Sequence, residues 1–238
     1  MTRAPAIARR EMSSYFFSPM AYVALALFLL ASGFMFWDDF QPGSPAEMRH
    51  IFQQMVWLLI FIVPVLSMGL LSQEWATGTI ESLMTAPVNE SDVVMGKFLG
   101  SFGFFGVLLA PTLLYAVMLS AYGQTDKGTI ACGYLGIVLV GGLFTSVGLF
   151  CSSLTRSQVV AAVTSATVLF VATVVPWWIA GRATLSDFWR SVADQCVIRR
   201  YEDFSKGIID TGNIVFFVAA TVLFLFLTVK VMESRRWK

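Results

Sequence analysis

The segment QEWATGTIESLMTAPVNESDVVMGK, residues 73–97, interrupts a very apolar chain. Long apolar runs precede and follow it, whereas the segment itself contains acidic and turn-forming residues. Gly78 can break the helix that leaves the preceding run. Pro87 can end a short second helix, because proline does not continue a helix. The segment therefore predicts a polar elbow between two membrane spans.

The residues inside this elbow favour two further helix starts. Thr79 can cap a short helix over residues 80–85, with Glu81 lying away from its apolar face. Asn89 can cap the next helix, with Asp92 three residues later in the manner of a capping box. We therefore expect a short helix held near the membrane surface, followed directly by the next span.

The composition places the chain among integral membrane proteins. Of its 238 residues, 57% are hydrophobic and 13% are charged. Soluble domains carry about 25% charged residues. The net charge is +1 with no strongly basic tract, so we expect membrane lipid and not nucleic acid as its surroundings.

Six apolar runs are long enough to cross a bilayer as helices, which takes about 20 residues. None of these runs contains Asp, Glu, Lys, Arg or His. We predict an all-α integral membrane fold in a single domain, residues 1–238, with six transmembrane helices. The spans are expected at residues 19–37, 51–72, 98–122, 130–151, 159–180 and 214–229.

Basic residues indicate the orientation of the spans. Arginines lie in the leader, residues 1–18, and further basic residues follow the last span. Lys and Arg favour the cytoplasmic side, and six spans put both termini on one side. We therefore expect both termini, and the loop 73–97, in the cytoplasm.

Two further helices are expected at the membrane surface. In the leader, Ala4, Ala8, Met12, Tyr15 and Phe16 share one helical face, which predicts an interfacial amphipathic helix; a simple basic anchor is the alternative.

The external loop, residues 181–213, has helical spacing of apolar residues from Leu185 to Cys196. This spacing predicts a short amphipathic helix before the last span. A solvated connector is the alternative.

The third span carries small residues on one side. Gly100, Gly103, Gly106 and Ala110 continue a stripe that starts at Gly96. Small residues let helix backbones approach closely in lipid, so the stripe predicts a helix-packing face. A face that lines an opening gap is the alternative.

Missing residues exclude several classes of function. Because no ionisable residue lies in the spans, a proton-coupled antiporter or a charged ion pore is disfavoured. The single histidine, His50, and three cysteines without metal-ligand spacing give no metal site. Gly96-Lys97 lacks the rest of a phosphate-binding loop. We therefore expect no enzyme activity and no cofactor on this chain.

The loop resembles the signature of type 2 ABC permeases, the six-span membrane subunits of ABC exporters. GTIESLMTAPV followed by VVMGK carries the resemblance. The leader is similar to the start of the family's sequences, and the C-terminal region is similar to the gliding-motility-associated branch. The matching positions are Glu74, Gly78, Thr79, Ile80, Glu81, Leu83, Pro87, Val88, Val93, Val94, Gly96 and Lys97. Trp75 and Ala76 depart from the family, in which basic residues often occur there.

The resemblance implies a function for the loop. It would hold the coupling helix that sits in a groove of a separate ATP-binding subunit, which binds ATP and Mg. A second permease copy, identical or related, and a location in the bacterial cytoplasmic membrane are also implied. Glu74 and Glu81 are expected to make polar contacts or brace the elbow. Lys97 is expected to reach lipid headgroups or to pair with Glu90 or Asp92.

Two readings of the whole assembly stay open at this point. The first is an ATP-driven exporter. The alternative is a mechanical transducer or assembly platform that uses ATP to move an extracytoplasmic partner, contacted through residues 187–210, without moving cargo.

Overall fold

The computed structural model describes residues 4–39, 48–78, 89–122, 126–180 and 196–236. Every regular element within these ranges is helical, and six helices are long and apolar enough to cross a membrane. The predicted all-α, six-span fold is therefore confirmed. The six helices are Pro19–Asp39, Arg49–Thr77, Glu90–Ala121, Lys127–Leu154, Gln158–Ile179 and Thr211–Arg235.

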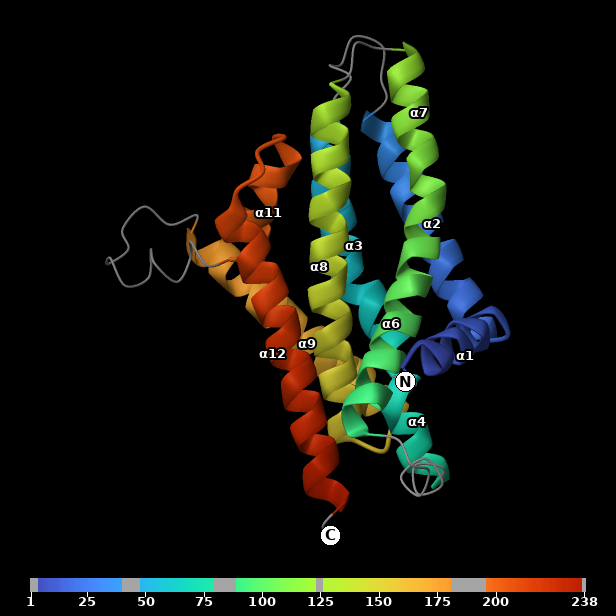
Figure 1. Ribbon diagram of the computed structural model, residues 1–238. Coiled ribbons are helices and arrows are strands. Elements are labelled where there is room, and N and C mark those ends of the chain that lie inside the picture. Colours follow the sequence, from blue (N-terminus) through green and yellow to red (C-terminus); the bar gives the residue numbers. More distant parts are fainter. Residues whose placement is uncertain (1–3, 40–47, 79–88, 123–125, 181–195, 237–238) are drawn as a thin grey trace.

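Several of these spans are divided or preceded by shorter elements (Figure 1). Pro111 lies in a 3₁₀ turn that interrupts the third span, because proline removes a backbone donor. The elements in chain order are α1 (Ala4–Phe16), α2 (Pro19–Asp39), α3 (Arg49–Ser67), α4 (Gly69–Thr77), α6 (Glu90–Leu109), η1 (Ala110–Thr112), α7 (Leu113–Tyr122), α8 (Lys127–Leu154), α9 (Gln158–Ala180), α11 (Val197–Ser205) and α12 (Thr211–Arg236).

Helix α8 is the centre of the bundle. In the apolar 18-residue stretch of each span, 78% of the α8 span is buried inside the bundle, against 17% of the α12 span. Glycines make this possible: a Cβ on Gly133 would overlap the ring of Phe52, and one on Gly141 would overlap the ring of Phe105. Close approach at small residues is the usual way in which helices pack in lipid.

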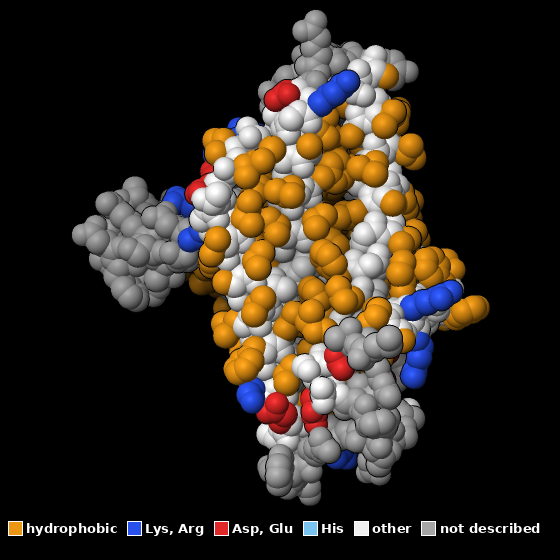
Figure 2. All heavy atoms as spheres, in the orientation of Figure 1, with side chains coloured by type: hydrophobic (Ala, Val, Ile, Leu, Met, Phe, Trp, Pro, Cys, Tyr) orange, Lys and Arg blue, Asp and Glu red, His pale blue; other side chains and the backbone are white. Residues whose placement is uncertain are grey.

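The surface of the bundle has the pattern of a membrane protein. On the face drawn in Figure 2, hydrophobic side chains cover the middle, and charged side chains gather toward the two ends. The end at which α4 ends and α6 begins is called the loop end below, because residues 79–88 connect the two helices there. The other end, which carries α11, is called the far end.

Helix α1 lies crosswise to the spans and packs against α6 (Figure 1). Glycine permits this close contact. A Cβ on Gly96 would lie 2.6 Å from the Cβ of Ile7, and a Cβ on Gly100 would lie 2.6 Å from the Cβ of Glu11. Gly103 faces the sulfur of Met12, whereas a Cβ on Gly106 would meet no described atom within 4 Å.

The predicted glycine stripe is therefore divided between two surroundings. Its first part faces the leader helix, and Gly106 and Ala110 are exposed. The predicted face of α1 lies against α6: Met12 faces Gly103, and Tyr15 and Phe16 contact Phe104, although Phe16 is the most exposed of these residues. Glu11, which was not part of the predicted face, also faces α6.

The structure adds a helix that the sequence did not predict. The helix expected from Leu185 to Cys196 lies outside the described residues, apart from Cys196 itself. Helix α11 begins at the next residue, and its Tyr201 and Phe204 are fully buried against Gly136 of α8. A buried aromatic pair therefore closes the far end of the bundle.

Candidate functional site

Helix α4 ends, and helix α6 begins, at the residues that the sequence predicts. Gly78 follows α4 in the left-handed conformation, with φ 72°, which favours glycine. Asn89 takes the N-cap position of α6 in an extended conformation. Its side chain makes no capping hydrogen bond, so the predicted capping box with Asp92 is wrong. The predicted site residues Thr79, Ile80, Glu81, Leu83 and Pro87 lie outside the described residues.

Lys97 joins three helices in the centre of this region. Its ammonium group donates to Oε1 of Glu11 on α1 and to Oε1 of Glu74 on α4, each at 2.8 Å. The lysine side chain is 2% exposed, and those of Glu11 and Glu74 are 15% and 16% exposed. The expected pairing of Lys97 with headgroups, Glu90 or Asp92 is therefore wrong.

The electrostatics of this cluster explain why it is tightly held. A charge in an apolar bundle must be paired, because the loss of hydration costs several kcal/mol per ion. Two carboxylates around one ammonium group leave an excess of one formal negative charge. Within the described residues, Oε2 of Glu74 is buried and has no hydrogen-bond partner. The cluster is thus rigid at Lys97 and incompletely satisfied at Glu74.

The second span is broken between α3 and α4, close to the cluster. The hydroxyl of Ser152 on α8 accepts from the backbone N–H groups of Leu71 and Ser72 at 3.1 and 3.0 Å. It donates to the carbonyl of Met68 at 2.8 Å. A side chain inserted in this way interrupts the i to i−4 ladder and bends a helix.

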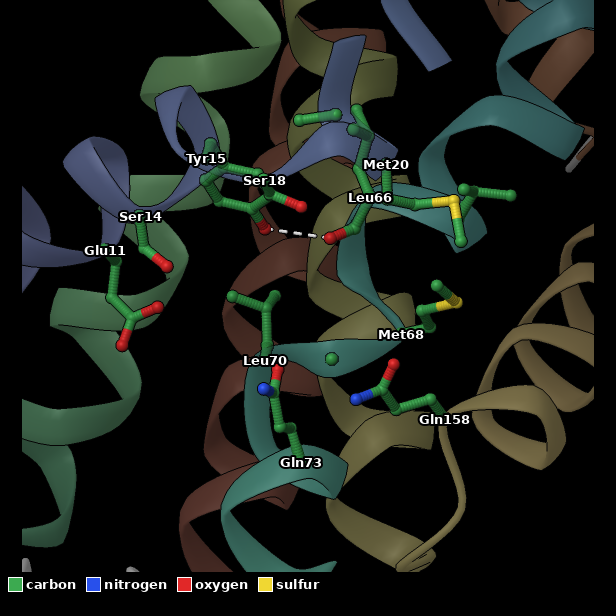
Figure 3. A pocket seen from close by; sticks show the side chains of 13 residues that line it. Glu11, Ser14, Tyr15, Ser18, Met20, Leu66, Met68, Leu70, Gln73 and Gln158 are labelled. Carbon is green, nitrogen blue, oxygen red and sulfur yellow. Dashed lines mark hydrogen bonds between the residues drawn. The ribbon is translucent and has the colours of Figure 1, made fainter. Parts of the chain in front are cut away.

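Helix α1 also contacts this break. The hydroxyl of Tyr15 donates to the carbonyl of Leu66 at 2.8 Å (Figure 3). Burial, and then the neighbouring charge of Glu11, raise the pKa of Tyr15, so its hydroxyl keeps the proton that it donates. The ring of Tyr15 stacks on Phe104 of α6 at a centroid distance of 4.7 Å. One residue of α1 thus contacts both the broken span and the third span.

The last turn of α12 reaches the same region. The guanidinium of Arg235 lies 4.7 Å from the ring centre of Trp75 on α4. One of its nitrogens donates to the carbonyl of Leu154, at the end of α8, at 2.6 Å. A positive charge therefore lies beside α4 although Trp75 and Ala76 replace the basic residues that the family resemblance leads one to expect there.

The sequence placed Glu74, Gly78, Gly96 and Lys97 in one segment, and the structure brings them to the loop end. Sequence reasoning missed Glu11, Tyr15, Ser152 and Arg235, which come from distant segments. One signal was present for the first of these. Glu11 is the only acidic residue in residues 1–18, and Lys97 lies next to a charge-free run, where a buried cation needs an anion.

Comparison with known proteins gives one result that covers most of these elements. The family model described as ABC-2 family transporter protein matches residues 18–190. The match is longer than half of the chain and includes the loop and Lys97, but not Glu11. It does not support the narrower assignment to the gliding-motility-associated branch. No curated protein matches the chain.

Proposed function

Since the chain belongs to the ABC-2 transporter family, we propose that it is the permease subunit of an ATP-driven exporter, moved by an ATP-binding subunit that docks on residues 73–97. Permeases of this family are in general non-catalytic membrane subunits that associate with ATP-binding subunits. On this proposal the partner binds ATP and Mg and hydrolyses the nucleotide.

The Lys97 cluster is the observation that supports the proposal most directly. Residues 79–88 connect α4 to α6, so a force on this loop acts on both helices. The ion pairs of Lys97 with Glu74 and Glu11 link these two helices to α1. The three helices would move as one unit when the docked subunits close.

The break at Met68 supplies a place where such a movement can bend the second span. Helix α4 belongs to the moving unit, whereas α3 packs into the core beside α8. Helix termini that absorb a change in backbone angles are common hinges. The proposal is that closure of the ATP-binding subunits rotates α4 about this break and opens a path for cargo toward the outside.

The charges support an orientation with both termini in the cytoplasm of a bacterial cell. Arg9 and Arg10 are exposed on α1, and Lys230 and Arg235 lie near the end of α12. Basic residues near span ends favour the cytoplasmic side. Two ATP-binding subunits close on one another, so we include a second permease copy, identical or related, in the proposed complex.

Affinity purification from native membranes in mild detergent, with mass spectrometry of subunit stoichiometry, tests the docking step. We expect an ATP-binding subunit at about one copy per permease chain. Scrambling residues 80–86 should remove it while the size-exclusion profile is kept, whereas Gly106→Ala, on an open face of α6, should retain it. A wild-type protein that purifies alone and is active would contradict the proposal.

A variant in the loop tests the coupling step separately. Glu81→Ala is expected to keep the ATP-binding subunit bound and hydrolysing ATP while transport is lost. Normal transport by this variant in reconstituted vesicles would remove Glu81 from the mechanism.

A further inference from the structure

A cavity of about 160 Å³ lies beside the ion cluster, between the turn that joins α1 to α2, the break between α3 and α4, and the start of α9 (Figure 3). Of its lining residues only Gln73 belongs to residues 73–97, on which the proposed docking depends. The question is what such a cavity holds when the protein is in a membrane.

The lining of the cavity is amphipathic. Gln73 lies near the end of α4 and Gln158 is the first residue of α9, so both are at the loop end. Met20 and Leu66 lie deeper, at the start of α2 and within α3. Glu11, Ser14 and Ser18 reach the cavity from the side of α1, so polar and apolar side chains both line it, as the headgroup and glycerol region of a phospholipid require.

Two carboxamides converge in the mouth of the cavity. A Cβ on Gly69 would lie 3.4 Å from Oε1 of Gln73 and 4.0 Å from the carboxamide carbon of Gln158. Within the described part of the chain, neither carboxamide has a hydrogen bond to another protein group. Their donors and acceptors are therefore available to a ligand.

The charge of the cavity selects among headgroups. Glu11 lines it, and the described lining contains no basic residue. The neighbouring cluster adds to this field, because Lys97 is already shared by two carboxylates. A site of this kind attracts an ammonium group and repels a headgroup of net negative charge.

We propose that the cavity binds the headgroup of an amine-bearing phospholipid of the phosphatidylethanolamine type, taken from the leaflet at the loop end. The ammonium group lies toward Glu11, and the carboxamides of Gln73 and Gln158 serve the phosphate and glycerol oxygens. The lipid contacts α1, α4 and α9 at once, so it stabilises the bent second span. The proposal requires only the membrane-spanning arrangement and stands apart from transport and from the ATP-binding subunit.

Native mass spectrometry of the purified protein in mild detergent tests this site. Phosphatidylethanolamine, phosphatidylcholine and phosphatidylglycerol with identical acyl chains are added in turn. We expect one phosphatidylethanolamine molecule to be retained about fivefold more tightly than phosphatidylglycerol, the size of effect given by a single partly exposed charge pair. Equal retention of all three lipids would overturn the proposal.

A matched pair of glycine variants locates the bound lipid. Gly69→Leu places a side chain in the cavity between the two carboxamides, whereas Gly106→Leu adds the same side chain on an open face of α6. We expect the first variant to lose the retained lipid and the second to keep it. Retention by a folded Gly69→Leu protein, shown by an unchanged thermal midpoint, would refute this location.

A third variant keeps the proposal testable if Gly69→Leu does not fold. Glu11→Gln retains an acceptor for Lys97 but removes the negative charge of the cavity. We expect the preference for phosphatidylethanolamine over phosphatidylglycerol to fall to about one, because the charge pair that provides it is gone. An unchanged preference would argue against the role of Glu11. Equal binding of soluble glycerophosphoethanolamine would exclude a lipid as the occupant.

Discussion

Both ends of the bundle have close apolar packing, but they differ in their polar contacts. At the loop end, buried Lys97 bonds Glu11 and Glu74 and so joins three helices through charge. At the far end, α11 is held mainly by the burial of Tyr201 and Phe204 against α8. The polar contact there runs through a neutral amide, since Asn213 of α12 accepts from Arg200 and donates to Asp203 of α11, at 3.0 and 2.9 Å.

The difference indicates what each end can do. Side chains that bond across a polar cluster set relative positions by direction and distance, so helices joined in this way move together. Close apolar packing instead resists any displacement, because interiors are filled to the density of an organic crystal. The charged link between three helices therefore suits the loop end to transmit a movement.

Removing the central cation is expected to have the largest effect. Lys97→Met leaves Glu11 and Glu74 without their shared partner, and loss of one member of a buried ion pair costs about 3–5 kcal/mol. We expect the thermal midpoint of the purified protein to fall sharply or the protein not to accumulate. Unfolding at the wild-type midpoint would mean that the cluster does not hold the loop end.

A charge-free version of the cluster is the matched control. The triple variant Lys97→Met, Glu11→Gln, Glu74→Gln buries no charge and is expected to regain most of the lost stability. Recovery of stability without recovery of transport would separate the transmitting role of the ion pairs from their structural role.

A change at the far end is expected to have an intermediate effect. In Gly136→Val the new Cβ would lie 2.8 Å from the Cβ of Phe204 and 2.9 Å from Tyr201, and such overpacking costs about 1–3 kcal/mol. We expect α11 to detach more often. Cys196, which is buried before α11 and donates to the carbonyl of Thr173, reports this through its rate of reaction with a thiol reagent.

The thiol chemistry sharpens this measurement. Burial raises the pKa of Cys196, so detachment increases both its access and its thiolate fraction. In a background of Cys132→Ser and Cys151→Ser, we expect labelling about tenfold faster, which corresponds to about 1.4 kcal/mol. Gly106→Val, on an open face of α6, is the control. Equal rates in the two variants would show that packing at Gly136 does not hold α11.

The smallest effect is expected for the contact between α12 and α4. Arg235→Ala removes the guanidinium above the half-buried Trp75 and its hydrogen bond to the carbonyl of Leu154. A cation over an aromatic ring near the surface contributes about 0.5–1 kcal/mol. We expect the thermal midpoint to fall by at most about 4 °C. Arg235→Lys keeps the positive charge but not the planar guanidinium, so its thermal midpoint should lie between those of the wild type and Arg235→Ala. If the thermal midpoint of Arg235→Ala fell as far as that of Lys97→Met, the contact of α12 would hold the loop end as strongly as the Lys97 cluster does.

The spans could be predicted from the sequence because their signal is local. A run without charges, such as residues 130–151, is recognised from composition alone, and the helix that contains it extends a few residues further at each end. The ends of α4 and α6 at Gly78 and Asn89 could also be predicted, since a helix break depends on the residues that make it. These features need no knowledge of the rest of the chain.

The partners within the site could not be predicted, because they are brought together by tertiary structure. Lys97 lies 23 residues from Glu74 and 86 from Glu11, and no periodic pattern connects such distances. The acidic residues at the start of α6 were preferred as partners because they lie nearest to Lys97 along the chain. Helix α11 was missed for another reason: the predicted helix of this loop was placed over the apolar spacing from Leu185 to Cys196, and α11 begins at the next residue.

Ser152 gives the second span two possible shapes. Its hydroxyl stands in for the bond that the N–H of Ser72 would otherwise make to the carbonyl of Met68. If α8 withdrew this hydroxyl, the N–H groups of Leu71 and Ser72 could return to the carbonyls four residues before them. Helices α3 and α4 would then form one continuous helix, with the proline Pro64 still inside it. A small shift of the central helix could thus close the break in its neighbour: both N–H groups would keep an acceptor, while Ser152 would give up its three hydrogen bonds.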